Sequence, residues 1–354
     1  MICRERRGIL LLLMMIFLCF GCAQADSPAY GQGKVKKGES QKETATFFAM
    51  DTVMEITVYG DPSLLEAAEE KILSLEKKMS VTNEESEISL LNQNGEQFLS
   101  SDTKELLSRA LELCGQTDGR LDISIYPIVR TWGFTTGEYR VPSGEELQTF
   151  LPYVDYTKIL VEDDRAVLKE GMQIDLGSVA KGYAGDQVIE LFCENGVTSA
   201  LLNLGGNVQA LGTKPDGSLW KIAIRNPMGE GYAGALEIAD KAVVTSGGYE
   251  RYFVQDGKTY RHIMDPETGY PVENGLVSVT VVGDEGVSCD ACSTALFVMG
   301  LEDAINFWRK TKDLDFEAVF ITEEGKVFIT EGLEGCFTLT GAYANAEMAV
   351  IQRE

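Results

Sequence analysis

Hydrophobic and polar residues alternate with two different periods along the first half of the chain. Residues 47–59 are rich in β-branched and aromatic side chains, which predicts a strand interrupted at Asp51. Residues 62–79 and 103–116 carry apolar side chains at the spacing of amphipathic helices. Two short apolar runs within residues 159–168 are separated by charged residues and predict a hairpin.

The second half of the chain is predicted to be rich in strands. Helices are expected from about residue 178 to 195, and at 287–299 and 302–312. The other apolar runs have the length and composition of strands: 200–204, 220–225, 236–238, 242–245, 276–282, 317–322, 326–330 and 337–340. Long helices mixed with strands, without a regular β-α-β alternation, predict the α+β fold class.

The first residues have the pattern of an export signal. Three arginines precede an uncharged apolar run at 8–20, which is too short to span a bilayer. The run ends at Gly21-Cys22, and a small residue followed by Cys in this place resembles a lipobox, in which the Cys receives lipid. We therefore predict that residues 1–21 are a lipoprotein signal peptide and that Cys22 is lipidated. The alternative is an ordinary cleaved signal.

The segment 22–43 is predicted to be a flexible tether. It is rich in Ser, Gly, Gln and Lys and has almost no large apolar residues that could form a core. A diacyl anchor on such an arm would hold the following domain, residues 44–354, at the outer face of the bacterial cytoplasmic membrane. That domain is long enough to contain two subdomains.

The charge and the cysteines exclude some classes of function. A formal net charge of −24 argues against nucleic-acid partners, and an anionic substrate would need a metal ion or a well-placed Lys or Arg. The cysteines after Cys22 are irregularly spaced and predict no disulfide scaffold. We interpret Cys289 and Cys292 as small residues on a helix, of which at least one is buried; a redox pair is the alternative.

Two glycine-containing segments could approach a phosphate, although the dinucleotide fingerprint and the P-loop are absent. The segment from Asp175 to Lys181 places an acid before a helix and a lysine in its first turns, where free N–H groups and positive charge favour phosphate. The segment Asn203–Asn207 has paired glycines at the end of a strand, which permit close backbone approach. A capped helix and a tight turn are the structural alternatives.

Two further segments carry groups for acid–base or metal chemistry. His262 is the only histidine and lies in a turn-rich stretch, which makes it a candidate general base. Asp290 and Thr294 are four residues apart on a predicted helix, so their oxygens share one face. Hard oxygen ligands suit Mg²⁺ in a site completed by water and phosphate. A structural histidine and a capped helical turn are the alternatives.

Taken together and in order, these segments closely resemble the ApbE family of FAD:protein FMN transferases, from about Phe47 to about Phe320. The matching stretches are 50–52, 79–80, 86–92, 121–124, 132–134, 175–183, 203–207, 214–217, 245–247, 249–253, 262–271 and 290–298. Asp51, Thr82 and Gly248 depart from the family pattern, which usually has a glycine, a flavin-stacking aromatic residue and an acid there.

The resemblance implies an α+β fold of the tunnelling-fold type with FAD in a cleft. Seven positions are implied to contact FAD: Met50, Thr82, Leu121, Asp122, Asp175, Lys181 and Ile263. The backbone carbonyl of Ser178 and the side chains of Asp290 and Thr294 are implied to bind Mg²⁺.

The implied reaction is phosphoryl transfer. A Thr or Ser hydroxyl of an acceptor flavoprotein, in the family a subunit of a membrane redox complex, attacks the FMN-side phosphorus of FAD, and AMP leaves. Positioning and charge neutralisation should supply most of the rate, with Asp290 and His262 as the catalytic residues and His262 as base or orienting group. An FAD pyrophosphatase and a non-catalytic FAD-binding lipoprotein are the alternatives.

Overall fold

The computed structural model describes residues 41–353. The predicted signal peptide, the lipidated Cys22 and most of the predicted tether lie outside these residues. Within 41–353, no helix combines the length and the apolar character needed to cross a membrane. The first strand begins at Lys42, so the expected domain start at residue 44 falls inside that strand.

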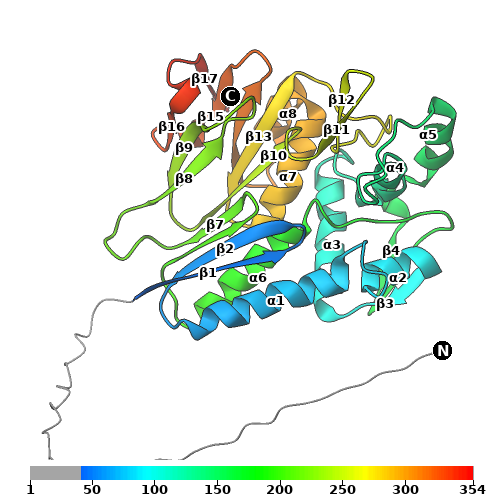
Figure 1. Ribbon diagram of the computed structural model, residues 1–354, viewed down its shortest axis with the longest axis horizontal. Coiled ribbons are helices and arrows are strands. Elements are labelled where there is room, and N and C mark those ends of the chain that lie inside the picture. Colours follow the sequence, from blue (N-terminus) through cyan, green and yellow to red (C-terminus); the bar gives the residue numbers. More distant parts are fainter. Residues whose placement is uncertain (1–40, 354) are drawn as a thin grey trace, which may run out of the picture. The chain divides into compact units, whose positions relative to one another are not determined.

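A nine-stranded sheet forms the centre of the fold (Figure 1). Its strands, in spatial order, are β1 (Lys42–Ala49), β2 (Thr52–Tyr59), β6 (Ala200–Leu204), β7 (Asn207–Leu211), β10 (Lys241–Gly247), β13 (Leu276–Gly283), β14 (Phe316–Thr322), β15 (Val327–Thr330) and β17 (Met348–Ile351). Neighbouring strands are antiparallel except β15 and β17, which are parallel. Every residue of β13 is buried, so the middle of the sheet is covered on both faces.

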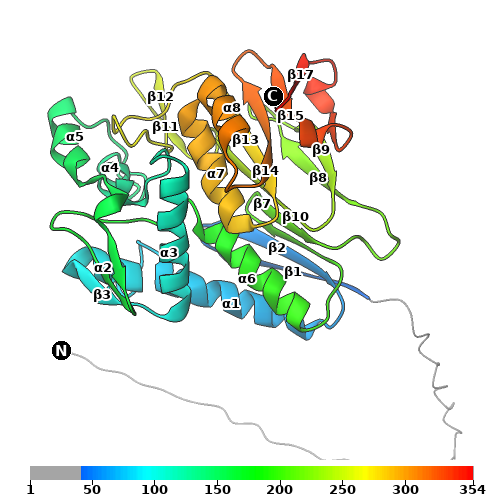
Figure 2. The ribbon, with the colours of Figure 1, turned by 180° about the vertical axis from the view of Figure 1, so that it is seen from behind.

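Four helices cover one face of this sheet (Figure 2). They are α1 (Ser63–Met79), α6 (Ala180–Glu194), α7 (Gly286–Met299) and α8 (Leu301–Lys310). The predicted apolar stripe of α1 is the buried face of that helix, with Ala68, Ile72 and Leu75 fully buried in one large core against the sheet.

A small sheet covers the other face. It consists of β8 (Trp220–Arg225), β9 (Tyr232–Ile238) and β16 (Phe337–Leu339). Alternate residues of β8, namely Trp220, Ile222 and Ile224, point inward and form a second apolar cluster with the large sheet. The fold therefore has three layers, in the order small sheet, large sheet and helices.

The remaining elements pack beside these layers. They are α2 (Glu87–Asn94), α3 (Ser101–Gln116), α4 (Tyr126–Thr131), α5 (Gly144–Phe150), β3 (Glu96–Phe98), β4 (Leu160–Glu162), β5 (Arg165–Val167), β11 (Tyr252–Gln255) and β12 (Lys258–Arg261), with short 3-10 turns between them. The buried Trp132 joins them through aromatic contacts with Phe253, Tyr260 and Tyr270.

The predicted α+β class is confirmed, and the long periodic elements lie within a few residues of their predicted places. The interruption at Asp51 is the turn of the β1–β2 hairpin, where Met50 and Asp51 have φ angles of 48° and 59°. Cys289 and Cys292 are free and buried on α7, as interpreted. Several short elements, among them α2, α4, β7, β11 and β17, were not predicted, because their apolar runs are too short to show a period.

The contact between α6 and α7 fixes the geometry of the helical layer. A Cβ atom at Gly182 would lie 2.2 Å from the carbonyl oxygen of Gly286, so only glycine permits this approach. The Asp186 carboxylate of α6 accepts the N–H groups of Gly286 and Val287, at 2.7 and 2.8 Å, and so caps α7. Gln209 of β7 donates to the Gly182 carbonyl at 2.9 Å and ties the contact to the sheet.

Replacing Gly182 by Ala should destabilise the protein. Alanine favours helices, but the clash with Gly286 should dominate and lower the free energy of unfolding by about 1–3 kcal/mol. The matched control is Gly115→Ala in α3, where the new Cβ meets nothing nearer than 3.9 Å and stability should rise by up to about 1 kcal/mol. Urea unfolding of both variants measures the difference, and equal effects would contradict the close packing of α6 on α7.

Candidate functional site

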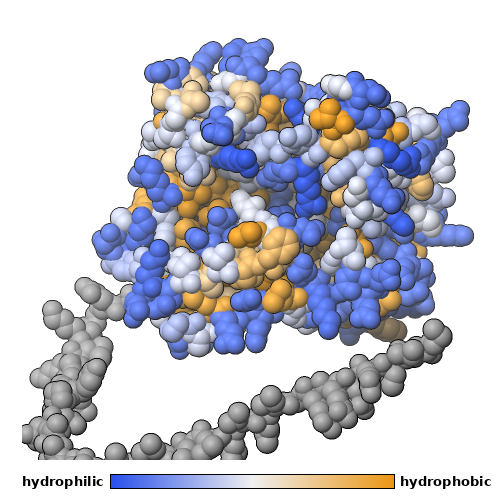
Figure 3. Space-filling model, viewed as in Figure 1, coloured by the Kyte–Doolittle hydropathy of each residue, from blue (hydrophilic) through white to orange (hydrophobic). Residues whose placement is uncertain are grey.

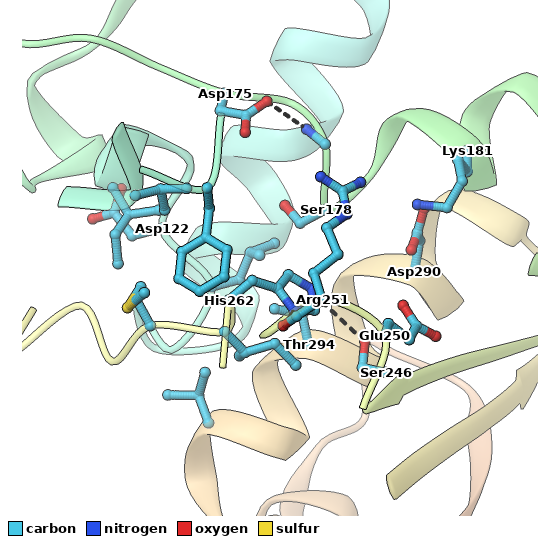
Figure 4. Close-up of a pocket in the computed structure, with 18 of the residues that line it drawn as sticks. Asp122, Asp175, Ser178, Lys181, Ser246, Glu250, Arg251, His262, Asp290 and Thr294 are labelled. Atoms are coloured by element: carbon cyan, nitrogen blue, oxygen red, sulfur yellow. Dashed lines mark hydrogen bonds between the residues drawn. The ribbon is translucent and has the colours of Figure 1, made fainter. Parts of the chain in front are cut away.

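A cleft lies where the start of α6, the α7 helix and the ends of β7 and β10 meet the segments 120–135 and 262–266 (Figure 4). A second pocket, beside the β1–β2 turn, adjoins it. Six residues line both pockets, so they are parts of one continuous cleft: Phe134, Thr135, Asp175, Gly177, Lys181 and Arg251.

The structure brings together all the site residues that the sequence indicated within the described range. Met50 and Thr82 line the second pocket. Asp175 and Lys181 line both pockets. The first pocket holds the rest: Leu121, Asp122, Ser178, His262, Ile263, Asp290 and Thr294. Segments from Met50 to Thr294, which are 244 residues apart in the chain, therefore surround a single cleft.

Asp290 is the buried carboxylate of the cleft. It is 5% exposed, and its Oδ2 accepts the N–H of Gly182 at 2.9 Å. Burial raises the pKa of Asp290, whereas the charge of Lys181 and the Gly182 N–H oppose the rise. Figure 4 shows Lys181 and Asp290 pointing toward each other. A partly bonded, buried carboxylate of this kind is suited to receive a cation.

The oxygens near Asp290 fit a magnesium ion. Thr294 lies one turn further along α7, and its Oγ1 is 3.2 Å from the Oγ of Ser246. Ser178 lines the same pocket from the loop before α6. Because Mg²⁺ is usually held by one or two carboxylates together with waters and substrate phosphate, one carboxylate with hydroxyl and carbonyl oxygens is a sufficient donor set. These residues therefore have the chemistry to hold the Mg²⁺ that the resemblance implies.

Lys181 and Arg251 carry positive charge, and their side chains project into the cleft (Figure 4). Arg120 also lines the cleft but is paired with Glu267. Within residues 41–353, neither the Lys181 nor the Arg251 side chain has a carboxylate oxygen within 4 Å. In a protein of net charge −24, two such cations mark a place for an anionic ligand.

The free helix N–H groups expected at the start of α6 are mostly occupied. The N–H groups of Val179 and Ala180 bond to the carbonyl oxygen of Leu176, at 3.0 and 2.8 Å, and that of Gly182 bonds to Asp290. The Asp175 carboxylate accepts the N–H of Gly177 at 2.9 Å. This helix start is therefore capped from within the protein, and phosphate recognition there falls mainly to the Lys181 side chain.

His262 is held in one tautomer. Its Nδ1 lies 3.2 Å from the carbonyl oxygen of Arg251. Because a carbonyl oxygen only accepts, we assign the proton to Nδ1, which leaves Nε2 as an acceptor. Burial, together with the charges of Arg251 and Lys181, lowers the pKa of His262 to about 4. The imidazole is therefore neutral near pH 7 and able to accept a proton.

The Asp122 carboxylate holds a turn in the wall of the cleft. Its Oδ1 accepts the N–H and the hydroxyl of Ser124, at 2.8 and 2.6 Å, and its Oδ2 accepts the N–H of Tyr156 at 3.1 Å. Burial raises the pKa of Asp122, and these bonds oppose the rise. A ligand at this carboxylate would share oxygens that already hold the adjacent turn.

The second pocket has apolar side chains at Met50, Met79 and Val81, beside the acidic Asp51 and Glu76. Phe48 and Val53, which lie opposite each other in the β1–β2 hairpin and outside this pocket, are 66% and 61% exposed. Figure 3 shows apolar surface over this hairpin. Met50 and Asp51, at the turn, line the pocket itself. The cleft therefore has a charged end at α6 and α7 and a less polar end at the hairpin.

Several residues that line the cleft had no role assigned from the sequence, among them Arg120, Phe134, Ser246, Glu250 and Arg251. Most lie in stretches that matched the family pattern, yet their residue types alone indicate no chemistry. Arg251 had the clearest available signal, since an acidic protein that binds an anion needs cations near the ligand.

This chain resembles proteins of one family in both its sequence and its structure. The sequence pattern of the ApbE family matches residues 50–320. A FAD:protein FMN transferase from Klebsiella pneumoniae is 35% identical over 218 residues, which cover 60% of this chain and 66% of that protein. One from Haemophilus influenzae is 30% identical over 85% of this chain and 93% of its own length. The crystal structure of the ApbE protein from Thermotoga maritima superposes with a TM-score of 0.79, at 32% identity, over 84% of this chain and 99% of its own.

The imidazole of His262 should titrate with a midpoint near 4. Because the chain has no other histidine, NMR of the untagged protein reports this group alone. Arg251→Gln should move the midpoint upward, since it removes a positive charge that disfavours the imidazolium. A midpoint near 6.5 in the unmodified protein would contradict the environment described for His262.

Proposed function

The chain belongs to the ApbE family, and we propose that it transfers FMN from FAD to a Thr or Ser hydroxyl of an acceptor flavoprotein, with release of AMP. The observation that carries this proposal is the placement of a neutral imidazole, two cations and a buried carboxylate around one cleft. Those groups match the needs of phosphoryl transfer, in which charge neutralisation and positioning dominate.

The charged end of the cleft would receive the pyrophosphate. Lys181 and Arg251 lie on its wall and would neutralise phosphate oxygens. Mg²⁺, held by the Asp290 and Thr294 side chains and the Ser178 carbonyl, would supply further charge neutralisation when bound. The flavin would occupy the less polar end, near Met50, Thr82, Leu121 and Ile263.

His262 would activate the attacking hydroxyl. As the acceptor oxygen forms its bond to the FMN-side phosphorus, the bond from that phosphorus to the AMP oxygen breaks. The hydroxyl proton passes to Nε2, which is free because Nδ1 bonds the Arg251 carbonyl. Arg251 therefore acts twice, through its carbonyl on His262 and through its side chain in the cleft.

We also propose where in the cell the protein acts. The signal-like residues 1–21, Cys22 and the polar segment after it support anchorage by lipid at the outer face of the bacterial cytoplasmic membrane. Acceptors in membrane redox complexes would lie within reach of such an arm.

The full chain, incubated with FAD, Mg²⁺ and an acceptor flavoprotein domain, should yield a covalent flavin adduct on the acceptor and one AMP per adduct. Mass spectrometry of the acceptor and chromatography of AMP measure both. Free FMN formed equally with and without acceptor would favour the pyrophosphatase. Intact FAD, bound without AMP release, would favour a binding protein.

The same assay tests Asp290. Asp290→Asn keeps an oxygen that can accept the Gly182 N–H but removes the negative charge, so the rate should fall by at least about 100-fold. Asp303→Asn, on the exposed surface of α8, is the matched control and should leave the rate unchanged.

His262→Gln should lower kcat by about 10²–10⁴-fold and leave the FAD dissociation constant nearly unchanged. Because the pKa of His262 is about 4, the base is already unprotonated at pH 6. In the unmodified enzyme, protonation of His262 should therefore lower kcat/KM only as the pH falls toward 4. An acidic limb of the pH profile centred near 6.5 would argue against His262 in this role.

A further inference from the structure

Asn207, the first residue of β7, has a buried side-chain amide in the wall of the cleft. The residue is 2% exposed and lines the cleft. Within residues 41–353, neither its Nδ2 nor its Oδ1 has a hydrogen-bond partner. Buried amides are nearly always bonded, because burial without a partner is unfavourable. The amide oxygen of Asn207, which has no donor among the described residues, therefore points to a ligand that donates to it.

The fold determines what Asn207 faces. Gln209 lies two residues further along β7 and so shares a face of the strand with Asn207. The Gln209 amide donates to the carbonyl of Gly182, so this face is turned toward the start of α6. The N–H of the same Gly182 is bonded to Asp290. Asn207 thus lies on the cleft side of the contact that holds the Asp290 carboxylate.

Charge also connects the two side chains. Burial raises the pKa of Asp290, whereas the charge of Lys181, the Gly182 N–H and the N–H groups of the nearby Asn207 amide oppose this rise. Glu250, Asp122 and Asp175 line the same pocket, so a carboxylate at position 207 would add to the negative charge around Asp290. A neutral amide supplies a donor and an acceptor without that repulsion.

We propose that Asn207 is a positioning residue of the cation site. When the cation is bound, the Nδ2 of Asn207 would donate to the Asp290 carboxylate, and its Oδ1 would accept a hydrogen bond from a water molecule of the hydrated Mg²⁺. The inference rests on the proposed function, since it requires a cation at Asp290. Mg²⁺ retains several waters, which can only donate and therefore need acceptors around them. Side chains that orient a metal ligand commonly change metal affinity by about 10–100-fold when replaced.

The test is Asn207→Leu, with Mn²⁺ binding followed by electron paramagnetic resonance. Leucine is close in size to asparagine, so the fold should be retained, and the melting temperature without metal measures any structural cost of the replacement. The Mn²⁺ dissociation constant should weaken by about 10-fold or more. A residue needed only for folding would give a lower melting temperature and unchanged Mn²⁺ affinity.

Ser199→Ala is the matched control. Ser199 is 6% exposed, its hydroxyl also lacks a partner among the described residues, and it does not line the cleft. Its replacement should leave Mn²⁺ affinity unchanged. If Asn207→Leu does not fold, Asn207→Ala provides the same comparison with a smaller side chain.

The outcomes separate this inference from the proposed function. An Asn207 variant that folds and binds Mn²⁺ within about three-fold of the unmodified protein overturns the role of Asn207. If the unmodified protein binds no Mn²⁺, or Asp290→Asn binds it equally well, the metal site itself fails. Loss of binding in both Asp290→Asn and Asn207→Leu, with Ser199→Ala unaffected, supports both.

Discussion

The close contact between α6 and α7 is the constraint on which the cleft depends. Each helix supplies a carboxylate to the start of the other: Asp186 of α6 bonds the first N–H groups of α7, and Asp290 of α7 bonds the N–H of Gly182 in α6. This exchange requires glycine at 182 and 286, because any Cβ there would meet neighbouring atoms at less than 3 Å. The contact satisfies helix ends that would otherwise remain unbonded, and it places the Asp290 carboxylate at the cleft.

A small set of neighbouring charged and titratable side chains determines the protonation states in the cleft. Lys181 and Arg251 provide positive charge in an acidic protein, and the same charges help to keep His262 neutral. Lys181 also favours the ionised form of Asp290 against the effect of burial. The cations that would hold a pyrophosphate thereby also set the protonation states that a base and a metal ligand require.

The capping pattern explains why single motifs were ambiguous in the sequence. The segment from Asp175 to Lys181 has features of a capped helix and of a phosphate site, and the structure shows that both descriptions apply to different atoms. The backbone N–H groups bond within the protein, whereas the Lys181 side chain is left for a ligand. Asp122 is a comparable case, because its carboxylate holds a turn and also lines the cleft.

The sequence by itself determined the long helices and strands, the α+β class and, through ordered resemblance, the residues that line the cleft. Local periodicity and residue order carry that information without any knowledge of packing. Only the tertiary structure decided that Gly182 and Gly286 touch and that the Arg251 carbonyl bonds His262. It also decided that Asn207 is buried with no hydrogen-bond partner among residues 41–353. These relations join residues far apart in the chain. Their energies depend on burial and distance, which no local pattern of residue types encodes.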